Sequence, residues 1–586
     1  MSSQDWHPVP GQLITRWVKD LDPLNPLPDY PRPQLCREEW LNLNGFWDYA
    51  VRPKKHTEIN SYDGKILVPF PLESALSGVK KKLSHKQRLF YRRFFSIPKT
   101  WKSNRILLHF GAVDWETRVK LNGKEVGSHK GGFIPFSFDI SEFINYEEEN
   151  ELEVIVWDPT NKGRQERGKQ SLRPSHAFYT AVSGIWQTVW LEPVPIAYIK
   201  SIKVTSDIDN QLVKLKVHVE NMQPGQKVTI EVLDDKKRIL STEGKTEFIL
   251  NIPRPKLWNP KSPFLYDLKL MLSDKTGSLD IVDSYFGMRK IELKSDEEGI
   301  PRILLNNQQI FQFGPLDQGY WPDGLYTAPT DEALRYDIEV TKDLGFNMTR
   351  KHVKVEPARW YHWCDKMGLL VWQDMPNGGI FSLLTFKLMS RGRRSREVRH
   401  QFRRELTEMI DYLYNFPSIV VWVPFNEGWG QFETEEIVDQ IRKQDQTRLI
   451  DAASGWFDKN VGDIKDIHKY PGPALETDSA RVAVLGEFGG LGMKINGHFW
   501  TGKRIYWSYS RSKTIEELET KYKELIIKLK PLITQGLTAA IYTQLTDIEG
   551  EINGYYTYDR EVLKMEKQFL GKLHNELFSD YISTSE

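Results

Sequence analysis

The run Ile419-Val-Val-Trp-Val-Pro-Phe425, which leads directly into Asn426-Glu427, decides the fold of the C-terminal half of this chain. A short run that is apolar throughout is typical of a strand buried on both faces of a parallel sheet. A helical pattern precedes it at residues 405–414. Strands that alternate with helices are the product of repeated βα units. The run is therefore interpreted as one strand of a repeated β/α architecture.

The same alternation extends on the N-terminal side of this strand. A helix is predicted from Thr330 to Gly345, followed by a strand at 346–349. The next predicted pair is a helix at 360–368 and a strand at 369–372. A region of about 290 residues in which strands and helices alternate predicts a (β/α)8 TIM barrel. A doubly wound sheet is the alternative, but no glycine-rich phosphate loop opens any of these units.

The N-terminal half shows the two-residue alternation of β-strands instead. Thr117-Arg-Val-Lys-Leu121 runs straight into Asn122-Gly123, which is a strong hairpin signal. A second β segment alternates in Val213-Lys-Leu-Lys-Val-His-Val219, and its length of about 100 residues suits an immunoglobulin-like sandwich. The predicted organisation is an extended arm over 1–34, a β-sandwich over 35–195, an immunoglobulin-like β-sandwich over 196–293 and the barrel over 294–586.

Composition excludes several classes of partner. The formal net charge of +1, with Lys and Arg spread along the chain, argues against nucleic acid. No apolar stretch approaches the roughly 18 residues that span a bilayer, so no membrane partner is expected. Cys36 and Cys364 form no Cys/His cluster, so neither a disulfide framework nor a zinc site is expected. The start at Met1 lacks a signal-peptide pattern, which fits a cytoplasmic protein, or a periplasmic or secreted one whose signal was removed.

Two predicted barrel strands end in a carboxylate. Glu427 follows the run described first, and Glu487 follows Val482-Ala-Val-Leu-Gly486. Their separation of about 60 residues fits two β/α units, whose carboxyl ends meet at one mouth of a barrel. Carboxylates facing each other across a cleft are the groups that hydrolyse glycosidic bonds. The 19 Trp, 24 Tyr and 28 Phe suit stacking on sugar rings, although large sandwiches also bury many aromatic side chains.

A series of recognisable motifs runs along most of the sequence. They are, in order, Leu41-Asn-Leu-Asn-Gly-Phe-Trp47, Phe110-Gly-Ala-Val-Asp114, Asn122-Gly-Lys-Glu-Val-Gly127, Gly131-Gly-Phe-Ile-Pro-Phe136, Ser183-Gly-Ile-Trp186, Gly345-Phe-Asn-Met-Thr-Arg350, Cys364-Asp-Lys-Met-Gly368, Asn426-Glu427, Gly486-Glu487 and Asn553-Gly-Tyr-Tyr-Thr-Tyr-Asp-Arg560. From about residue 35 to 570 the chain resembles glycoside hydrolase family 2, which contains β-galactosidases, β-glucuronidases and β-mannosidases. The resemblance implies a multidomain β plus α/β fold, with a jelly-roll β-sandwich, an immunoglobulin-like β-sandwich and a C-terminal catalytic barrel.

The resemblance also implies a retaining exo-glycosidase and assigns roles to its residues. Glu427 would be the acid/base and Glu487 the nucleophile of a double displacement. Asn426 would bind the sugar 2-hydroxyl. Arg350 would keep the nucleophile ionised by its charge, and Tyr470 would lie against that nucleophile.

Three further residues are candidates for substrate binding. His352 is expected to contact the sugar. Asp317 and Asp374 lie at the first strand ends, where each could bind substrate hydroxyls or cap a following helix. No cofactor is expected.

Departures from the family pattern narrow the range of expected substrates and cofactors. Uronate-cleaving members carry an Asn-x-Lys signature where this chain has Glu551-Ile-Asn553, so acidic sugars are disfavoured. Metal-dependent members carry a Glu-x-His pair where this chain has Met375-Pro-Asn-Gly-Gly379, so no metal is expected. Gln544 stands where many members place a sugar-stacking Trp.

The predicted substrate is an oligosaccharide or glycoside with terminal β-galactose. A β-D-galactofuranoside or an α-L-arabinofuranoside is the alternative within the family. A non-catalytic glycan-binding protein with an inert barrel is the alternative from another functional class. The presence of both Glu427 and Glu487 argues against it. The oligomeric state stays open, a homo-oligomer included.

Overall fold

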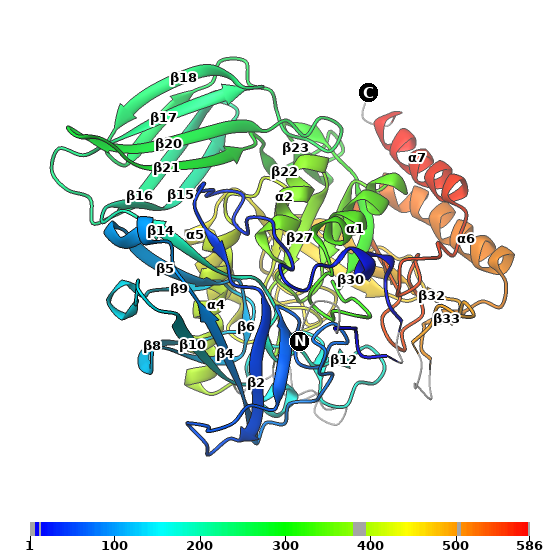
Figure 1. The fold of residues 1–586 in the computed structure, drawn as a ribbon. Helices are drawn as coiled ribbons and strands as arrows, with labels where there is room; N and C mark the ends of the chain where they lie inside the picture. Colours follow the sequence, from blue (N-terminus) through cyan, green and yellow to red (C-terminus); the bar gives the residue numbers. More distant parts are fainter. Residues whose placement is uncertain (1–5, 11–12, 379–393, 501–505, 584–586) are drawn as a thin grey trace.

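The computed structural model describes residues 6–10, 13–378, 394–500 and 506–583. Two β-sandwiches, blue to cyan and green in Figure 1, lie beside a barrel whose elements run from light green to red. The predicted combination of two sandwiches and a C-terminal (β/α)8 barrel is confirmed. Among the helices of the described residues, none is long and apolar enough to cross a membrane.

The first sandwich packs a six-stranded sheet against a four-stranded one around a shared apolar core. The larger sheet has the order β3 (Gly64–Val68), β2 (Gly45–Pro53), β4 (Gln87–Phe95), β10 (Asn150–Trp157), β7 (Glu116–Leu121) and β8 (Lys124–Lys130). The smaller has the order β1 (Leu41–Asn42), β14 (Val189–Val194), β5 (Arg105–Phe110) and β9 (Phe136–Asp139). Short pairs and single turns complete it: β6 (Val113–Asp114) with β13 (Gly184–Ile185), β11 (Gln170–Ser171) with β12 (Tyr179–Thr180), η2 (Lys99–Ser103), η3 (Ser141–Phe143) and η4 (Thr160–Lys162).

The hairpin predicted at Asn122-Gly123 is present between β7 and β8. Thr117, Val119 and Leu121 alternate into the core along β7. Asn122 and Gly123 follow with φ of 51° and 76°. Positive φ at both central positions gives the type I′ turn, whose twist matches that of two antiparallel strands.

The second sandwich has the seven strands of an immunoglobulin-like domain. One sheet contains β15 (Tyr198–Asp207), β16 (Leu212–Glu220) and β19 (Glu247–Asn251); the other contains β18 (Lys237–Gly244), β17 (Lys227–Asp234), β20 (Tyr266–Asp274) and β21 (Gly277–Phe286). Every second residue of β16 is buried, from Val213 to Val219. A small sheet then leads into the barrel, with β22 (Ile291–Ser295), β23 (Pro301–Leu305) and β24 (Gln308–Gln309).

The barrel sheet is parallel throughout its recorded pairings, and its first strand pairs with its last. Its order is β29 (Leu449–Ile450), β28 (Ile419–Val423), β27 (Leu370–Asp374), β26 (Met348–Lys351), β25 (Gln312–Asp317), β34 (Leu537–Thr543), β31 (Val482–Gly489) and β30 (Ile464–Lys469). The pairing of β25 with β34 excludes a doubly wound sheet, in which the chain order reverses at a switch point.

Helices surround this sheet. They are α1 (Asp331–Asp343), α2 (Ala358–Met367), α4 (Arg396–Leu413), α5 (Thr434–Gln444), α6 (Ile515–Thr534) and α7 (Lys567–Ser583), with the short pair β32 (Leu491–Gly492) and β33 (Ser510–Arg511) before α6. The helices α1, α2 and α4 overlap the predicted segments, α4 begins nine residues earlier than predicted, and α5, α6 and α7 were not predicted. The Thr330 side chain caps α1 by accepting a hydrogen bond from the Ala333 N–H. Gly368 ends α2 in the left-handed conformation.

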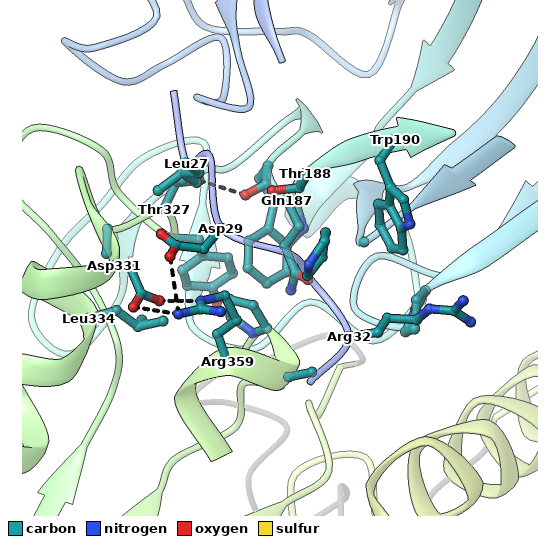
Figure 2. A pocket seen from close by; sticks show the side chains of 18 of the residues that line it. Leu27, Asp29, Arg32, Gln187, Thr188, Trp190, Thr327, Asp331, Leu334 and Arg359 are labelled. Atoms are coloured by element: carbon teal, nitrogen blue, oxygen red, sulfur yellow. Dashed lines mark hydrogen bonds and ion pairs between the residues drawn. The ribbon is translucent and has the colours of Figure 1, made fainter. Parts of the chain in front are cut away.

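The described part of the N-terminal arm lies over the seam between the first sandwich and the barrel. It contains η1 (Arg16–Asp20), and its Tyr30 and Arg32 side chains both bind the buried carboxylate of Glu192. A cavity of about 60 Å³ remains at the seam, and Figure 2 shows Asp29 of the arm and Asp331 of the barrel converging there on Arg359. Neither strand-end glutamate lines this cavity.

Arg289, just after β21, joins the second sandwich to the barrel. Its buried guanidinium donates hydrogen bonds to the carbonyl oxygens of Pro417, Thr447 and Ile419. These carbonyls lie where β28 begins and just before β29, so one side chain fixes the sandwich against neighbouring barrel strands.

Arg289→Ala is expected to lower the thermal unfolding midpoint by several degrees. The substitution leaves buried carbonyl oxygens without this donor, and each unsatisfied group costs about 1–3 kcal/mol. Scanning calorimetry measures the shift. The control is Arg238→Ala, which removes an exposed ion pair with Glu231 and should change stability by less than about 0.5 kcal/mol. Equal midpoints for the two variants would show that Arg289 does not join the domains.

Candidate active site

The two strand-end glutamates meet at one mouth of the barrel. Glu487 belongs to β31, and Glu427 lies four residues beyond the end of β28. One carboxylate oxygen of each lies within 4.8 Å of the other. Glu487 is buried, with 5% of its surface exposed, whereas Glu427 is partly exposed. Glu487 therefore lies in the interior of the site, and Glu427 lies nearer its opening.

His468, on β30, lies between the two carboxylates. Its Nδ1 is 3.0 Å from Glu427 Oε1 and 3.6 Å from Glu487 Oε2. Burial alone would lower the pKa of His468, but the charges of Glu487 and Glu427 raise it above its ordinary value. In its protonated form the ring donates a hydrogen bond to Glu427 and attracts Glu487.

Cationic and hydroxyl groups surround the nucleophile candidate Glu487. The Tyr470 hydroxyl donates to its Oε2 at 2.5 Å, and Arg350 Nη1 is 3.5 Å from its Oε1. Burial opposes ionisation here, yet the nearby charges of His468 and Arg350 lower the pKa of Glu487 to about 2. The carboxylate is therefore ionised at any ordinary working pH.

Arg350 joins several strand ends through one buried guanidinium. Its Nε and Nη2 donate to the two oxygens of Asp374, each at 3.0 Å, in the bidentate geometry that fixes orientation. Nη2 also donates to Asn426 Oδ1 at 2.8 Å. The amide oxygen of Asn426 is thus occupied, while its amide nitrogen has no hydrogen-bond partner among the described residues. That nitrogen remains available to a ligand beside Glu427.

The other predicted substrate-binding residues divide into two groups. His352 Nδ1 is 3.1 Å from Asp374 Oδ2 and 3.9 Å from Glu487. His352 and Asp374 therefore belong to the network around the nucleophile candidate. Burial lowers the pKa of His352 well below its ordinary value, which makes the ring neutral. Asp317 instead binds Lys351 Nζ at 2.6 Å and the Gly319 N–H. No contact recorded for the described residues joins Asp317 to either glutamate.

Asp466 fixes the backbone beside both glutamates. It accepts hydrogen bonds from the Gly486 N–H at 2.6 Å and from Ser454 Oγ at 2.5 Å. Ser454 in turn accepts from the Glu427 N–H at 2.8 Å and lies 2.9 Å from His468 Nε2. A Cβ at position 486 would come within 2.0 Å of the Asp466 carboxylate, which explains why glycine precedes Glu487.

Sequence reasoning missed His468, Ser454 and Asp466. A signal for His468 was present, because residues i and i+2 of a strand face the same side and Tyr470 was already a candidate. Asp466 occupies the next position in the same series on β30. Ser454 lies in the loop after β29, where no periodic pattern marks it.

One group of side chains in the described part of the chain could hold a metal ion, and it consists of Glu427, His468 and Glu487. The Arg350 guanidinium lies 3.5 Å from Glu487, and the raised pKa of His468 favours the positively charged form of its ring. Positive charge at both places opposes a divalent cation. The expectation that no metal takes part is therefore retained.

A parallel barrel with two carboxylates facing each other at its mouth is the arrangement that glycoside hydrolases use. Three sequence models of one family match the chain: its galactose-binding domain-like model over residues 75–187, its family 2 model over 197–289 and its TIM barrel domain model over 303–472. The chain belongs to glycoside hydrolase family 2.

Similar proteins carry two kinds of name. A putative β-glucuronidase of Formosa agariphila is 28% identical over 60% of this chain and 41% of its own length. A β-galactosidase of Thermoanaerobacter pseudethanolicus is 26% identical over 61% of this chain and 47% of its own length. The matched region thus spans less than half of these relatives. The structure of a β-D-glucuronidase from Dictyoglomus thermophilum superposes with a TM-score of 0.74 at 21% identity, covering 94% of this chain and 98% of that one, which shows the shared fold.

His468→Gln is expected to reduce thermal stability most at low pH. A group whose folded-state pKa is raised stabilises the fold fully below its ordinary pKa, about 6.5 for histidine, and loses this effect as pH rises through the folded-state value. The difference in unfolding midpoint between wild type and variant should therefore shrink from pH 6 to pH 9. His56→Gln, at an exposed position of the first sandwich, serves as the control. A difference that is constant or grows with pH would exclude a charged His468.

Proposed function

We propose that this protein is a retaining exo-glycosidase that removes terminal non-reducing sugar residues by double displacement. The observation that carries the proposal is the distance of at most 4.8 Å between carboxylate oxygens of Glu427 and Glu487. Retaining enzymes hold their carboxyl groups about 5–5.5 Å apart, whereas inverting enzymes need about 6.5–9.5 Å to admit a water molecule. The short distance leaves room for an anomeric carbon and favours direct attack on it.

The ionised state of Glu487 supports a division of labour between the two glutamates. Glu487, with its pKa lowered to about 2, is the nucleophile that attacks the anomeric carbon. Glu427 gives its proton to the departing oxygen as the glycosidic bond breaks. A water molecule then attacks the glycosyl–enzyme, Glu427 takes the proton from that water, and Glu487 is released. Two inversions at the same carbon retain the configuration.

The surrounding groups prepare these steps before substrate binds. Tyr470 and Arg350 hold the Glu487 carboxylate from two sides. The free amide nitrogen of Asn426 is placed to donate to the sugar 2-hydroxyl, a contact that strengthens in the transition state of glycoside hydrolysis. His468 keeps the Glu427 carboxylate oriented towards the leaving group. Donors fixed in advance stabilise developing charge without reorganisation.

We infer a neutral sugar, with a β-galactoside as the first candidate. Glu551 and Asn553 stand where uronate-cleaving members of the family have Asn and Lys, and Asn553 donates to Glu551 at 2.9 Å instead of offering a positive charge. A furanoside is the second candidate, because Gln544 stands where a stacking Trp is common. Gln544 accepts a hydrogen bond from Gln318 and donates one to Asn553, so it belongs to a polar network.

Glu487→Ala and Glu427→Ala are expected to fail in different ways. Glu487→Ala should abolish turnover of every natural glycoside, because no nucleophile remains. Glu427→Ala should lose roughly 10²–10⁴-fold on substrates with poor leaving groups, the usual value of general acid–base catalysis. A dinitrophenyl glycoside needs no acid, so its glycosyl–enzyme should accumulate until azide releases a glycosyl azide of retained configuration.

Rate measurements and NMR of the azide products distinguish these outcomes. Glu476→Ala, which removes an exposed carboxylate of the barrel, is the control and should keep full activity. An inverted glycosyl azide from Glu427→Ala would mean that the two roles are exchanged.

A panel of 4-nitrophenyl glycosides is expected to give the highest kcat/KM with a neutral sugar, the β-galactoside first. The panel includes the β-glucuronide, the β-galactofuranoside and the α-L-arabinofuranoside. A furanoside as the best substrate would select the second candidate. The β-glucuronide as the best substrate would refute the inference from Glu551 and Asn553.

A further inference from the structure

One loop of the first sandwich reaches the catalytic mouth of the barrel. The Arg167 and Gly168 N–H groups donate to the Asn377 carbonyl oxygen at 3.2 and 2.9 Å. The Asn377 side chain accepts from the Asn426 N–H at 2.6 Å. Two hydrogen-bonded steps therefore connect this loop to the residue that precedes Glu427.

The next residue of this loop, Lys169, has an unusual environment. It is 92% buried, since only 8% of its surface is exposed. Within the described ranges, no hydrogen bond or ion pair reaches its ammonium group, and its recorded contact is the ring of Trp429, centred 6.0 Å from Nζ. A buried charge without a partner is costly. A lysine held in this way at the edge of a catalytic site is a candidate for ligand binding.

Tyr179, on β12, connects Lys169 to Glu551 of the barrel. The Lys169 carbonyl accepts from the Tyr179 N–H at 2.9 Å, and the Tyr179 hydroxyl donates to Glu551 Oε2. Burial raises the pKa of Glu551, and the charge of Lys169 opposes that rise. No ion pair within 4.0 Å joins the two groups among the described residues. The two groups therefore lie near one another through Tyr179 without a direct bond between them.

A hydroxyl group is the ligand that fits between an ammonium and a carboxylate. It accepts a hydrogen bond from the ammonium and donates one to the carboxylate at the same time. A substrate carboxylate can accept from Lys169 but has no proton for Glu551, which would repel it. The charge of Lys169 also acts on Glu487, whose pKa it helps to lower.

We propose that Lys169 of the first sandwich and Glu551 of the barrel together bind one hydroxyl of the terminal sugar and thereby select neutral sugars over uronic acids. The inference rests on the proposed glycosidase function. It assigns sugar selection in part to a domain that carries neither catalytic glutamate. The barrel alone would lack half of this contact.

The test is a double-mutant cycle with the best neutral substrate of the panel and its monodeoxy analogues. Lys169→Met should lower kcat/KM by about 10- to 100-fold, the usual loss of a hydrogen bond to a charged group. One monodeoxy analogue should show a similar loss with wild type and almost no further loss with Lys169→Met, because both changes remove the same contact. Lys169→Arg should recover part of the activity.

Two controls separate this contact from other effects. Lys99→Met, on the exposed surface of the same sandwich, should behave as wild type. The pH profile of kcat/KM for Lys169→Met should keep its shape, since a lysine that acts only by keeping Glu487 ionised would instead move the acidic limb upward. Circular dichroism verifies that each variant is folded, and Lys169→Arg provides the second variant should Lys169→Met unfold.

The outcomes that overturn the proposal are distinct. Losses that add independently for Lys169→Met and every monodeoxy analogue show that no hydroxyl meets Lys169. A shifted acidic limb without a coupled analogue assigns Lys169 to the nucleophile alone. Preferential loss of uronide turnover in Lys169→Met shows that the ligand is a carboxylate. A wild-type protein that hydrolyses no glycoside overturns the proposed function, and this inference with it.

Discussion

The buried guanidinium of Arg350 is the constraint around which the barrel mouth is organised. A charge removed from water must be surrounded by partners, because an unpaired buried ion is among the most destabilising features of a protein interior. Here those partners are Asp374, Asn426 and Glu487, which come from three different strand ends. Satisfying one side chain on β26 therefore fixes the ends of β27, β28 and β31 relative to one another. The same guanidinium contacts both the Asn426 amide oxygen and the Glu487 carboxylate, so it holds these two side chains near one another.

Local patterns were sufficient to predict the fold and the two glutamates. The apolar run that ends at Phe425 is typical of a strand buried on both faces, and repeated units of this kind predicted the barrel. Alternation and the Asn122-Gly123 turn predicted the sandwich hairpin. Glu427 and Glu487 stood out because a carboxylate directly after such a strand needs a special environment. These inferences depend on a few neighbouring residues, and such short-range information is present in a single sequence.

Contacts between distant segments escaped prediction. Asp317 has the same strand-end position as Asp374, but Lys351 on the neighbouring strand takes its carboxylate, a pairing that requires knowledge of side-chain directions. Lys169 looked like any loop lysine of the first sandwich, because its burial comes from docking on a barrel loop more than 200 residues away in sequence. His468 is intermediate between these cases, since the two-residue period of β30 pointed to it once Tyr470 was considered.

The docking of the sandwich loop on Asn377 has a consequence for heat inactivation. Asn377 holds both that loop and the backbone of Asn426, so one residue joins the sandwich loop to the catalytic mouth. Loosening of the sandwich would release this anchor while the barrel strands remain paired. Regions of a protein open with different free energies, and the least stable region that touches a site limits its working range. The upper temperature of function would then be decided by the contact between two domains, well before the barrel itself melts.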